Sequence, residues 1–122
     1  MNKPISRKAH GLADLTYIPL TALSPELLNF KSDSKASTLA RVLGGAMLGS
    51  ALLTRSEWGL FKVLPFKAHL AADAGIGLFS LAAPWLLKFS KNVAARNTFL
   101  FVGLSGLIIG GLLTQRNEMQ AR

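Results

Sequence analysis

Apolar residues occur in four blocks along the chain, and polar or charged residues separate these blocks. The blocks cover approximately residues 10–29, 37–54, 67–89 and 97–114. A helix needs about 20 residues, within a range of about 17–25, to cross the hydrocarbon core of a bilayer. The pattern therefore predicts an all-α protein with four transmembrane helices. The clearest span is 97–114, because it contains no charged residue.

The four blocks are two copies of one pattern. Residues 8–30, KAHGLADLTYIPLTALSPELLNF, recur at 67–89 as KAHLAADAGIGLFSLAAPWLLKF. With one inserted residue the alignment continues from 38–54 onto 98–114. Its identical pairs include Thr38/Thr98, Val42/Val102 and Thr54/Thr114. Each copy is thus expected to be a two-helix repeat.

The repeats define the expected domain organisation. We predict a single membrane domain over residues 1–122, with repeat 1 at 8–54 and repeat 2 at 67–114. Two crossings return the chain to its starting side, so both repeats have the same orientation in the membrane. The connection 55–66 contains too few apolar residues to cross, and we expect it to lie at the interface with Trp58 at headgroup depth.

Composition supports a membrane protein. Hydrophobic residues make up 50% of the chain and charged residues only 16%, whereas a soluble domain has about a quarter charged residues. The net charge of +8 comes without a basic face interleaved with aromatics, so the expected partner is the lipid bilayer and not nucleic acid. The absence of cysteine excludes disulfides and thiolate metal sites.

Lys and Arg residues are distributed unequally between the two ends of the predicted helices. One end carries Lys3, Arg7, Lys8, Arg55, Lys62, Lys67, Arg116 and Arg122. The other end carries Lys31, Lys35, Lys88, Lys91 and Arg96. Because cytoplasmic segments are enriched in Lys and Arg, both termini are expected in the cytoplasm. The first nine residues are polar and basic, so no cleavable signal peptide is expected.

Two His–Asp pairs are the candidate polar site. His10 and Asp14 lie four residues apart, as do His69 and Asp73, so each pair shares one helix face. If the repeats bring the pairs together, two imidazoles and two carboxylates can bind a divalent metal or relay protons. The favoured interpretation is a local structural pair near the start of each helix. No catalytic residue, cofactor or metal is therefore assigned.

A proline lies near the far end of the first helix of each repeat, at Pro25 and Pro84. Each removes a hydrogen bond to the carbonyl four residues earlier, at Thr21 or Ser80. Hydroxyl groups can satisfy such freed carbonyls in membrane helices. Trp85 follows the second proline and is expected to anchor the helix at the interface.

Small residues recur at a spacing of four, which allows helices to approach closely. The principal examples are Gly45/Gly49 and Gly106/Gly110. We expect these residues to pack within the chain, and the alternative is contact with another subunit.

The repeated pattern resembles the SPW repeat family of small bacterial integral membrane proteins. That family is named for a Ser-Pro-Trp motif near the end of the first helix of a two-helix unit, and the resemblance runs from about Ser6 to Thr114. It implies a multi-pass protein of the bacterial inner membrane and no particular activity. The two motif positions here are Ser24-Pro25-Glu26 and Ala83-Pro84-Trp85, so each copy departs from the motif at one residue.

The sequence thus predicts a small integral membrane protein with a structural or interaction role. Such a protein would be an accessory subunit or scaffold that contacts further copies of itself or another membrane protein. The alternative is a small transporter or proton-coupled channel that uses the two His–Asp pairs. Motifs such as GxxxxGK[ST], HExxH and GxSxG are absent from the sequence, so an enzyme is not expected.

Overall fold

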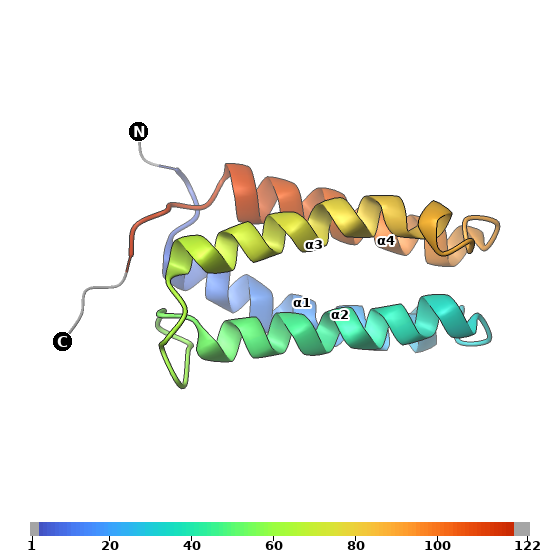
Figure 1. The fold of residues 1–122 in the computed structure, drawn as a ribbon, viewed down its shortest axis with the longest axis horizontal. Coiled ribbons are helices and arrows are strands. Elements are labelled where there is room, and N and C mark those ends of the chain that lie inside the picture. Colours follow the sequence, from blue (N-terminus) through green and yellow to red (C-terminus); the bar gives the residue numbers. More distant parts are fainter. Residues whose placement is uncertain (1–2, 119–122) are drawn as a thin grey trace.

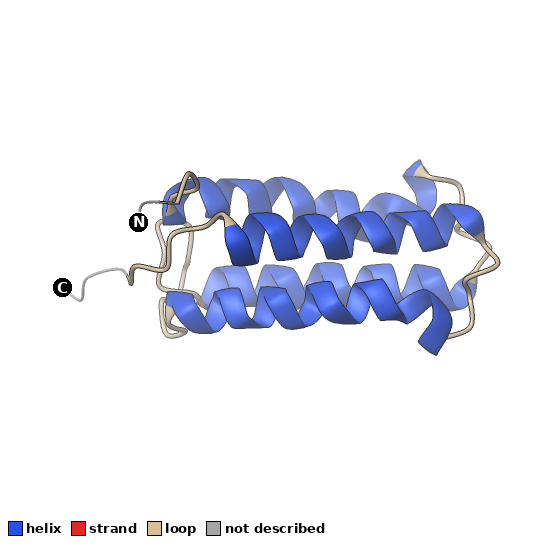
Figure 2. Cartoon of the chain, turned by 90° about the horizontal axis from the view of Figure 1, so that it is seen from above, coloured by secondary structure: helices blue, strands red, loops and turns tan. Residues whose placement is uncertain are grey.

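The computed structural model describes residues 3–118, which form four long helices. Helix α1 spans Arg7–Leu27, α2 spans Ser34–Leu53, α3 spans Phe66–Leu86, and α4 spans Val93–Ser105 and continues as the π-helix η1, Gly106–Leu112. Helices α1 and α2 form one hairpin, and α3 and α4 form a second that packs beside it (Figure 1; Figure 2). The described part of the chain has isolated β-bridges but no strand. The predicted all-α fold of two tandem hairpins is confirmed.

Two helical segments are long and apolar enough to cross a membrane: Ser34–Leu53 and Val93–Leu112. Both begin before the predicted starts at 37 and 97, because a polar residue caps each first turn. Asp33 accepts the N–H of Ala36 at 3.1 Å, and Asn92 accepts that of Ala95 at 3.2 Å. Such caps satisfy backbone donors that have no partner inside the helix. Hydropathy alone does not detect these polar first turns.

The π-helix explains why the two repeats differ in length. Asp33 and Asn92 are 59 residues apart, whereas Thr54 and Thr114 are 114 − 54 = 60 apart. A π-helix accommodates one extra residue because its hydrogen bonds run from i to i+5. Accordingly, Leu113 N–H donates to Ile108 O at 2.9 Å. The extra residue therefore lies within η1.

The predicted alignment of 38–54 with 98–114 is wrong over its first part. That alignment placed the inserted residue before Thr98, but burial contradicts it: Val42 is 58% exposed and Val102 only 8%. Gly44 and Gly103, which are 103 − 44 = 59 residues apart, are the equivalent residues instead. A Cβ added at Gly44 would lie only 2.8 Å from Ala22 Cβ, and a Cβ added at Gly103 would lie only 2.7 Å from Gly77 O. These glycines allow the helices of each hairpin to touch.

An apolar core fills the half of the bundle next to the two hairpin turns. Phe89 and Phe99 pack edge to face there, with ring centroids 5.2 Å apart. The other buried members of this core are Phe30, Ala36, Ala40, Leu43, Ala83 and Ala95. This packing holds both hairpins together at the end opposite the chain termini (Figure 1).

The residues that precede α1 and α3 are hydrogen-bonded in the same way to the segments that follow the two hairpins. Ile5 and Leu64, which precede α1 and α3, each bridge to the segment that follows a hairpin. The four backbone bonds are Ile5 N–H to Leu113 O (3.0 Å), Gln115 N–H to Ile5 O (2.8 Å), Leu64 N–H to Leu53 O (2.7 Å) and Arg55 N–H to Leu64 O (2.8 Å). The internal symmetry thus extends beyond the helices.

The connection between the hairpins also covers the start of α1. Trp58 Nε1 donates to Lys8 O at 2.8 Å, and a Cβ at Gly11 would overlap the indole. Arg7 Nε and Nη2 donate to the two oxygens of the Glu57 carboxylate at 3.0 and 3.1 Å. These hydrogen bonds hold the pKa of Glu57 below its usual range. The connection is therefore fixed to the bundle and is not a free linker.

Candidate functional site

The structure brings the two His–Asp pairs together between the hairpins, near the end where the chain termini lie. His10 and Asp14 come from α1, and His69 and Asp73 come from α3. One ligand atom of each residue lies within 4.8 Å of the others. We call these four residues the His–Asp cluster. The histidine side chains are 2% and 3% exposed, whereas those of Asp14 and Asp73 are 21% and 13% exposed.

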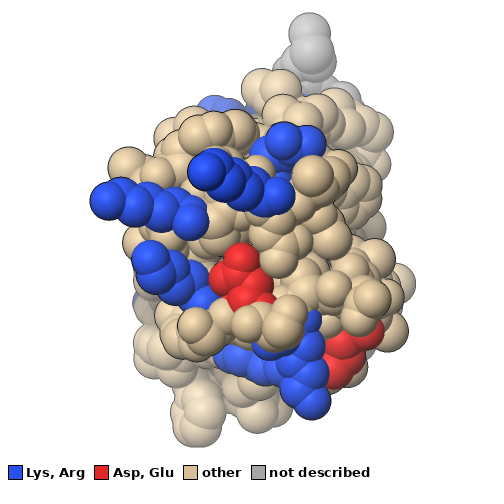
Figure 3. All heavy atoms as spheres, turned by 90° about the vertical axis from the view of Figure 1, so that its right-hand side faces the viewer, with Lys and Arg blue, Asp and Glu red and all other residues tan. Residues whose placement is uncertain are grey.

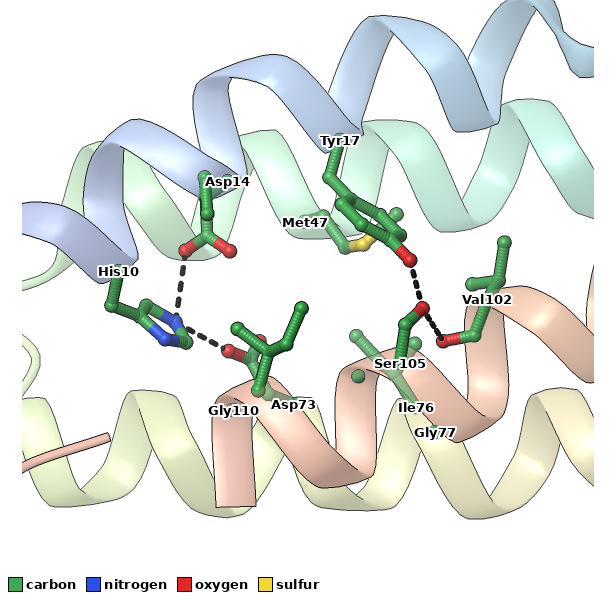
Figure 4. Close-up of a pocket in the computed structure, with 13 residues that line it drawn as sticks. His10, Asp14, Tyr17, Met47, Asp73, Ile76, Gly77, Val102, Ser105 and Gly110 are labelled. Atoms are coloured by element: carbon green, nitrogen blue, oxygen red, sulfur yellow. Dashed lines mark hydrogen bonds and ion pairs between the residues drawn. The ribbon is translucent and has the colours of Figure 1, made fainter. Parts of the chain in front are cut away.

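The shorter contacts of the His–Asp cluster run between the repeats. His10 Nε2 lies 2.9 Å from Asp73 Oδ2 and 3.2 Å from Asp14 Oδ2. His69 Nε2 lies 2.9 Å from Asp14 Oδ2 and 3.2 Å from Asp73 Oδ2. Figure 4 shows the His10 ring pointing between both carboxylates. The i,i+4 pairs are present, but each histidine is closer to the aspartate of the other repeat.

Threonine hydroxyls hold the second nitrogen of each imidazole. Thr114 Oγ1 lies 3.1 Å from His10 Nδ1, and Thr54 Oγ1 lies 2.9 Å from His69 Nδ1. Both hydroxyls donate their own protons to helix carbonyls: Thr114 donates to Ile109 O, and Thr54 donates to Ser50 O. A hydroxyl has one donor, so it must accept from Nδ1–H. Both rings therefore direct Nε2 into the His–Asp cluster.

Phe66 covers the His–Asp cluster from one side. Its side chain is 1% exposed, stacks on the His69 ring at a centroid distance of 5.9 Å and meets the His10 ring edge to face at 5.7 Å. Glu118 accepts the N–H groups of Phe66 and Lys67 at 2.6 and 3.0 Å. A carboxylate is favourable at this helix start because of the helix dipole. The C-terminal segment thus helps to close the site.

A cavity of about 40 Å³ adjoins the carboxylates on the opposite side. Its lining includes Asp14, Asp73, Met47 and Ser105, and Tyr17 donates from its hydroxyl to Ser105 Oγ at the far end (Figure 4). A water molecule needs at least about 10–15 Å³. The cavity is therefore large enough for small ligands of the carboxylates.

The residues that orient and cover the His–Asp cluster were not predicted from the sequence. Thr54 and Thr114 were already visible as an identical pair in the repeats. Ser50 Oγ also lies 2.9 Å from His69 Nδ1, but its counterpart in repeat 2 is Gly110. No sequence signal points to Phe66, because repeat 1 has Arg7 at the corresponding position. The histidine environments are consequently similar but not identical.

The predicted small-residue positions differ in their surroundings. An added Cβ would meet no atom within 4 Å at Gly45, Gly49 or Gly106. At Gly110 it would lie 3.4 Å from Asp73 Cβ, so Gly110 packs against the His–Asp cluster. Gly45 and Gly49 therefore leave an open strip on α2 instead of contacting the other helices.

The family model of the SPW repeat domain matches residues 8–113. The chain belongs to the SPW repeat family. The match covers both hairpins and confirms the expected family. The comparisons with curated proteins and with solved structures gave no match. Together with the two apolar helices, SPW family membership identifies a small membrane protein.

The first SPW motif has a serine that compensates for its proline. Pro25 has no N–H to donate to Thr21 O, and Ser24 Oγ donates to this carbonyl at 2.7 Å. In the second SPW motif Ala83 replaces the serine, and Ser80 Oγ is a buried hydroxyl without a partner in residues 3–118. The motif serine thus restores a hydrogen bond that the proline removes.

The third residue of the SPW motif has different partners in the two repeats. Glu26 accepts from Arg41 Nη1 at 2.7 Å and from Arg41 Nη2. In repeat 2 the corresponding residues are Trp85 and Leu100, and Trp85 is 56% exposed. A charged pair in one hairpin therefore replaces two apolar side chains of the other. This exchange explains the glutamate in the first motif.

Replacing Ser24 by alanine should lower the free energy of unfolding in detergent by about 0.5–1.5 kcal/mol, the net value of a typical hydrogen bond. Chemical or thermal unfolding followed by circular dichroism measures this change. Ser32→Ala is the matched control, since Ser32 is exposed. Equal stability of the Ser24→Ala variant and the wild type would show that the hydroxyl does not compensate for the proline.

Proposed function

We propose that this SPW repeat protein is a multi-pass protein of the bacterial inner membrane that acts through interaction with other membrane proteins. It would serve as an accessory subunit or scaffold, associate first with further copies of itself, and have no catalytic role. The observation that carries this proposal is the apolar core in the half of the bundle near the hairpin turns. Because buried apolar side chains occupy the centre of this half, the surface available for function is the outside of the helices.

The dimensions of α1 and α3 support four crossings. Each helix has 21 residues, which corresponds to about 31 Å at a rise of 1.5 Å per residue and matches the ~30 Å hydrocarbon core. Both helices also expose large apolar side chains that suit contact with lipid. These include Leu12, Leu15, Leu20, Leu23 and Leu27 on α1, and Leu78, Phe79, Trp85 and Leu86 on α3.

The proposed orientation places both chain termini in the cytoplasm. This orientation rests on the greater number of Lys and Arg residues at the end that contains the termini and the hairpin connection, because cytoplasmic segments are enriched in these residues. One of these, Arg122, lies outside the described residues. The opposite end is also basic, and Figure 3 shows few acidic side chains there. Basic side chains at both ends suit contact with anionic lipid headgroups.

The open strip on α2 supports association of copies. Gly45 and Gly49 have free space where a side chain would be, and Val42 beside them is 58% exposed. Small residues at this spacing let a second helix approach closely in a bilayer. Contact through this strip would bury it without changing the packing of either hairpin.

Transport is the second candidate function, and the His–Asp cluster is the observation that favours it. Ionisable groups inside a membrane are costly and commonly mark ion or proton pathways. A transport pathway from this cluster to the other side would have to open the core around Phe89 and Phe99. We therefore rank transport below interaction.

Replacing Gly45 and Gly49 together by leucine tests the interaction role. We expect the double variant to fold as the wild type does, because the added side chains meet open space, and to lose association. Energy transfer between donor- and acceptor-labelled copies in lipid vesicles measures association. Gly75→Leu is the control, since Gly75 is also open.

Two outcomes would contradict the interaction role. The first is equal energy transfer in the wild type and the Gly45→Leu, Gly49→Leu variant. The second is a wild type that shows no energy transfer and conducts cations or protons into vesicles, with this flux abolished by Asp14→Asn and Asp73→Asn. The second result would establish transport.

A further inference from the structure

We infer that the His–Asp cluster binds one divalent transition-metal cation of the Zn²⁺ type and thereby links the two hairpins. The four ligands are the Nε2 atoms of His10 and His69 and the Oδ2 atoms of Asp14 and Asp73. Each repeat supplies one imidazole and one carboxylate. A metal bound here is compatible with either candidate function.

Five of the six distances between the ligand atoms are close to those of a tetrahedral site, and the sixth, between the two Oδ2 atoms, is within 4.8 Å. Zinc bonds of about 2.0–2.1 Å to nitrogen and oxygen place neighbouring ligands of a tetrahedron about 3.3 Å apart. The two Nε2 atoms lie 3.3 Å apart. The four nitrogen-to-oxygen distances are 2.9 or 3.2 Å. A cation can therefore bind at the centre after shifts of a few tenths of an ångström.

The ligand types select the kind of cation. Two imidazoles with two carboxylates suit Zn²⁺ and related transition metals. Calcium takes six to eight oxygen ligands, and magnesium requires octahedral coordination largely by oxygen. Two carboxylates also balance the charge of one divalent cation. The cluster therefore favours a transition metal over both of these hard cations.

The surrounding hydroxyls prepare both rings for metal binding. Each Nδ1–H donates to a hydroxyl, that of Thr114 for His10 and those of Thr54 and Ser50 for His69. The lone pair of a neutral imidazole therefore lies on Nε2 and faces the centre of the cluster. This orienting hydrogen bond is typical of metal-bound histidine. Without a cation or shared protons, the two Nε2 lone pairs would face each other and the two carboxylates at about 3 Å. Such an arrangement is repulsive, because all four atoms are hydrogen-bond acceptors and no donor lies between them.

Burial and access are also consistent with a metal site. The histidines are almost fully buried, and Phe66 covers them on one side. The carboxylates are partly exposed and border the cavity of about 40 Å³. A cation can thus reach the carboxylates first, and the imidazoles complete its coordination. The dry surroundings of the rings then strengthen its binding electrostatically.

Titration of the full-length protein with Zn²⁺ tests this inference. The protein is purified in mild detergent, stripped with a chelator and titrated with ZnCl₂ in a calorimeter, with MgCl₂ and CaCl₂ in parallel. We expect one Zn²⁺ per chain, much weaker binding of Mg²⁺ and Ca²⁺, and a higher melting temperature with Zn²⁺. X-ray absorption at the zinc edge should show four nitrogen or oxygen ligands, two of them imidazoles.

Variants locate the bound ion. Asp14→Asn with Asp73→Asn should abolish binding, whereas Glu57→Gln, which removes a charge from the same end of the bundle, should not. Thr114→Val, and Thr54→Val combined with Ser50→Ala, keep all four ligands and remove the hydroxyl partners of His10 and of His69. Each should weaken binding about 10–100-fold, as loss of an orienting partner does. These hydroxyl variants keep the test valid if the aspartate variant does not fold.

Three results would overturn the metal site. One is a folded wild type that binds no Zn²⁺. Another is equal affinity in the wild type and both hydroxyl variants. The last is an absorption spectrum without imidazole ligands, which would place the ion elsewhere.

Discussion

Replacing Asp73 by alanine is expected to lower the free energy of unfolding by about 3–5 kcal/mol, the usual cost of removing one partner from a buried ionic group. Asp73 contacts both His10 and His69. Its loss leaves Asp14 as the one carboxylate for two buried imidazoles. Unfolding in mixed micelles, followed by circular dichroism without added metal, measures the change.

Replacing the entire cluster by leucine should cost much less. A buried ionic group can often be exchanged for apolar residues of similar volume with little loss, or with a gain, of stability. The variant that combines His10→Leu, Asp14→Leu, His69→Leu and Asp73→Leu should therefore be about as stable as the wild type. Such stability would show that the fold does not require these polar groups. Destabilisation as large as that of Asp73→Ala would instead make the cluster a structural element.

Phe99→Ala is expected to have an effect of similar size, about 3–5 kcal/mol, on the free energy of unfolding. Phe99 is 1% exposed, and its ring packs on Phe89, which lies in the α3–α4 turn. Truncation removes this contact and leaves a cavity in the apolar core. The same unfolding measurement applies.

Phe61→Ala is the matched control, since Phe61 is 67% exposed. We expect its unfolding free energy to lie within about 0.5 kcal/mol of the wild type, as for most surface substitutions. A similar loss in both variants would mean that the core near the hairpin turns is not the main source of stability.

Much of the fold was predictable because the chain is duplicated. The first helix contains two prolines and Asp14, and its hydropathy alone argues weakly for a helix of this length. Its copy at 67–89 supported it, and α1 indeed spans Arg7–Leu27. The polar first turns at Asp33 and Asn92 were missed because a hydropathy pattern does not detect capping.

The inserted residue shows a limit of sequence alignment. Thr38/Thr98 and Val42/Val102 are identical pairs, yet they face different surroundings in the two repeats. Identity alone placed the insertion before Thr98, whereas η1 absorbs it near the C-terminal end of the last helix. A π-helix has no reliable sequence signature, so only the backbone reveals its position.

The four residues of the candidate site were predictable from the sequence, but the contacts between them were not. Spacing placed His10 with Asp14 on one face, but it cannot show that the shorter contact of His10 is with Asp73. That contact depends on how the hairpins dock, which is set by packing of side chains distant in sequence. The orienting hydroxyl of Thr114 lies 104 residues from His10 and is equally beyond local patterns.

The matched bonds at Ile5 and Leu64 make the order of the two hairpins arbitrary. A circularly permuted chain, opened within the connection after Arg55 and closed by a short linker between the segments at Ile5 and Gln115, would keep every helix and the whole His–Asp cluster. For the same reason, two copies of a single hairpin could form this arrangement as a dimer. The present chain has the architecture expected from fusion of such a dimer.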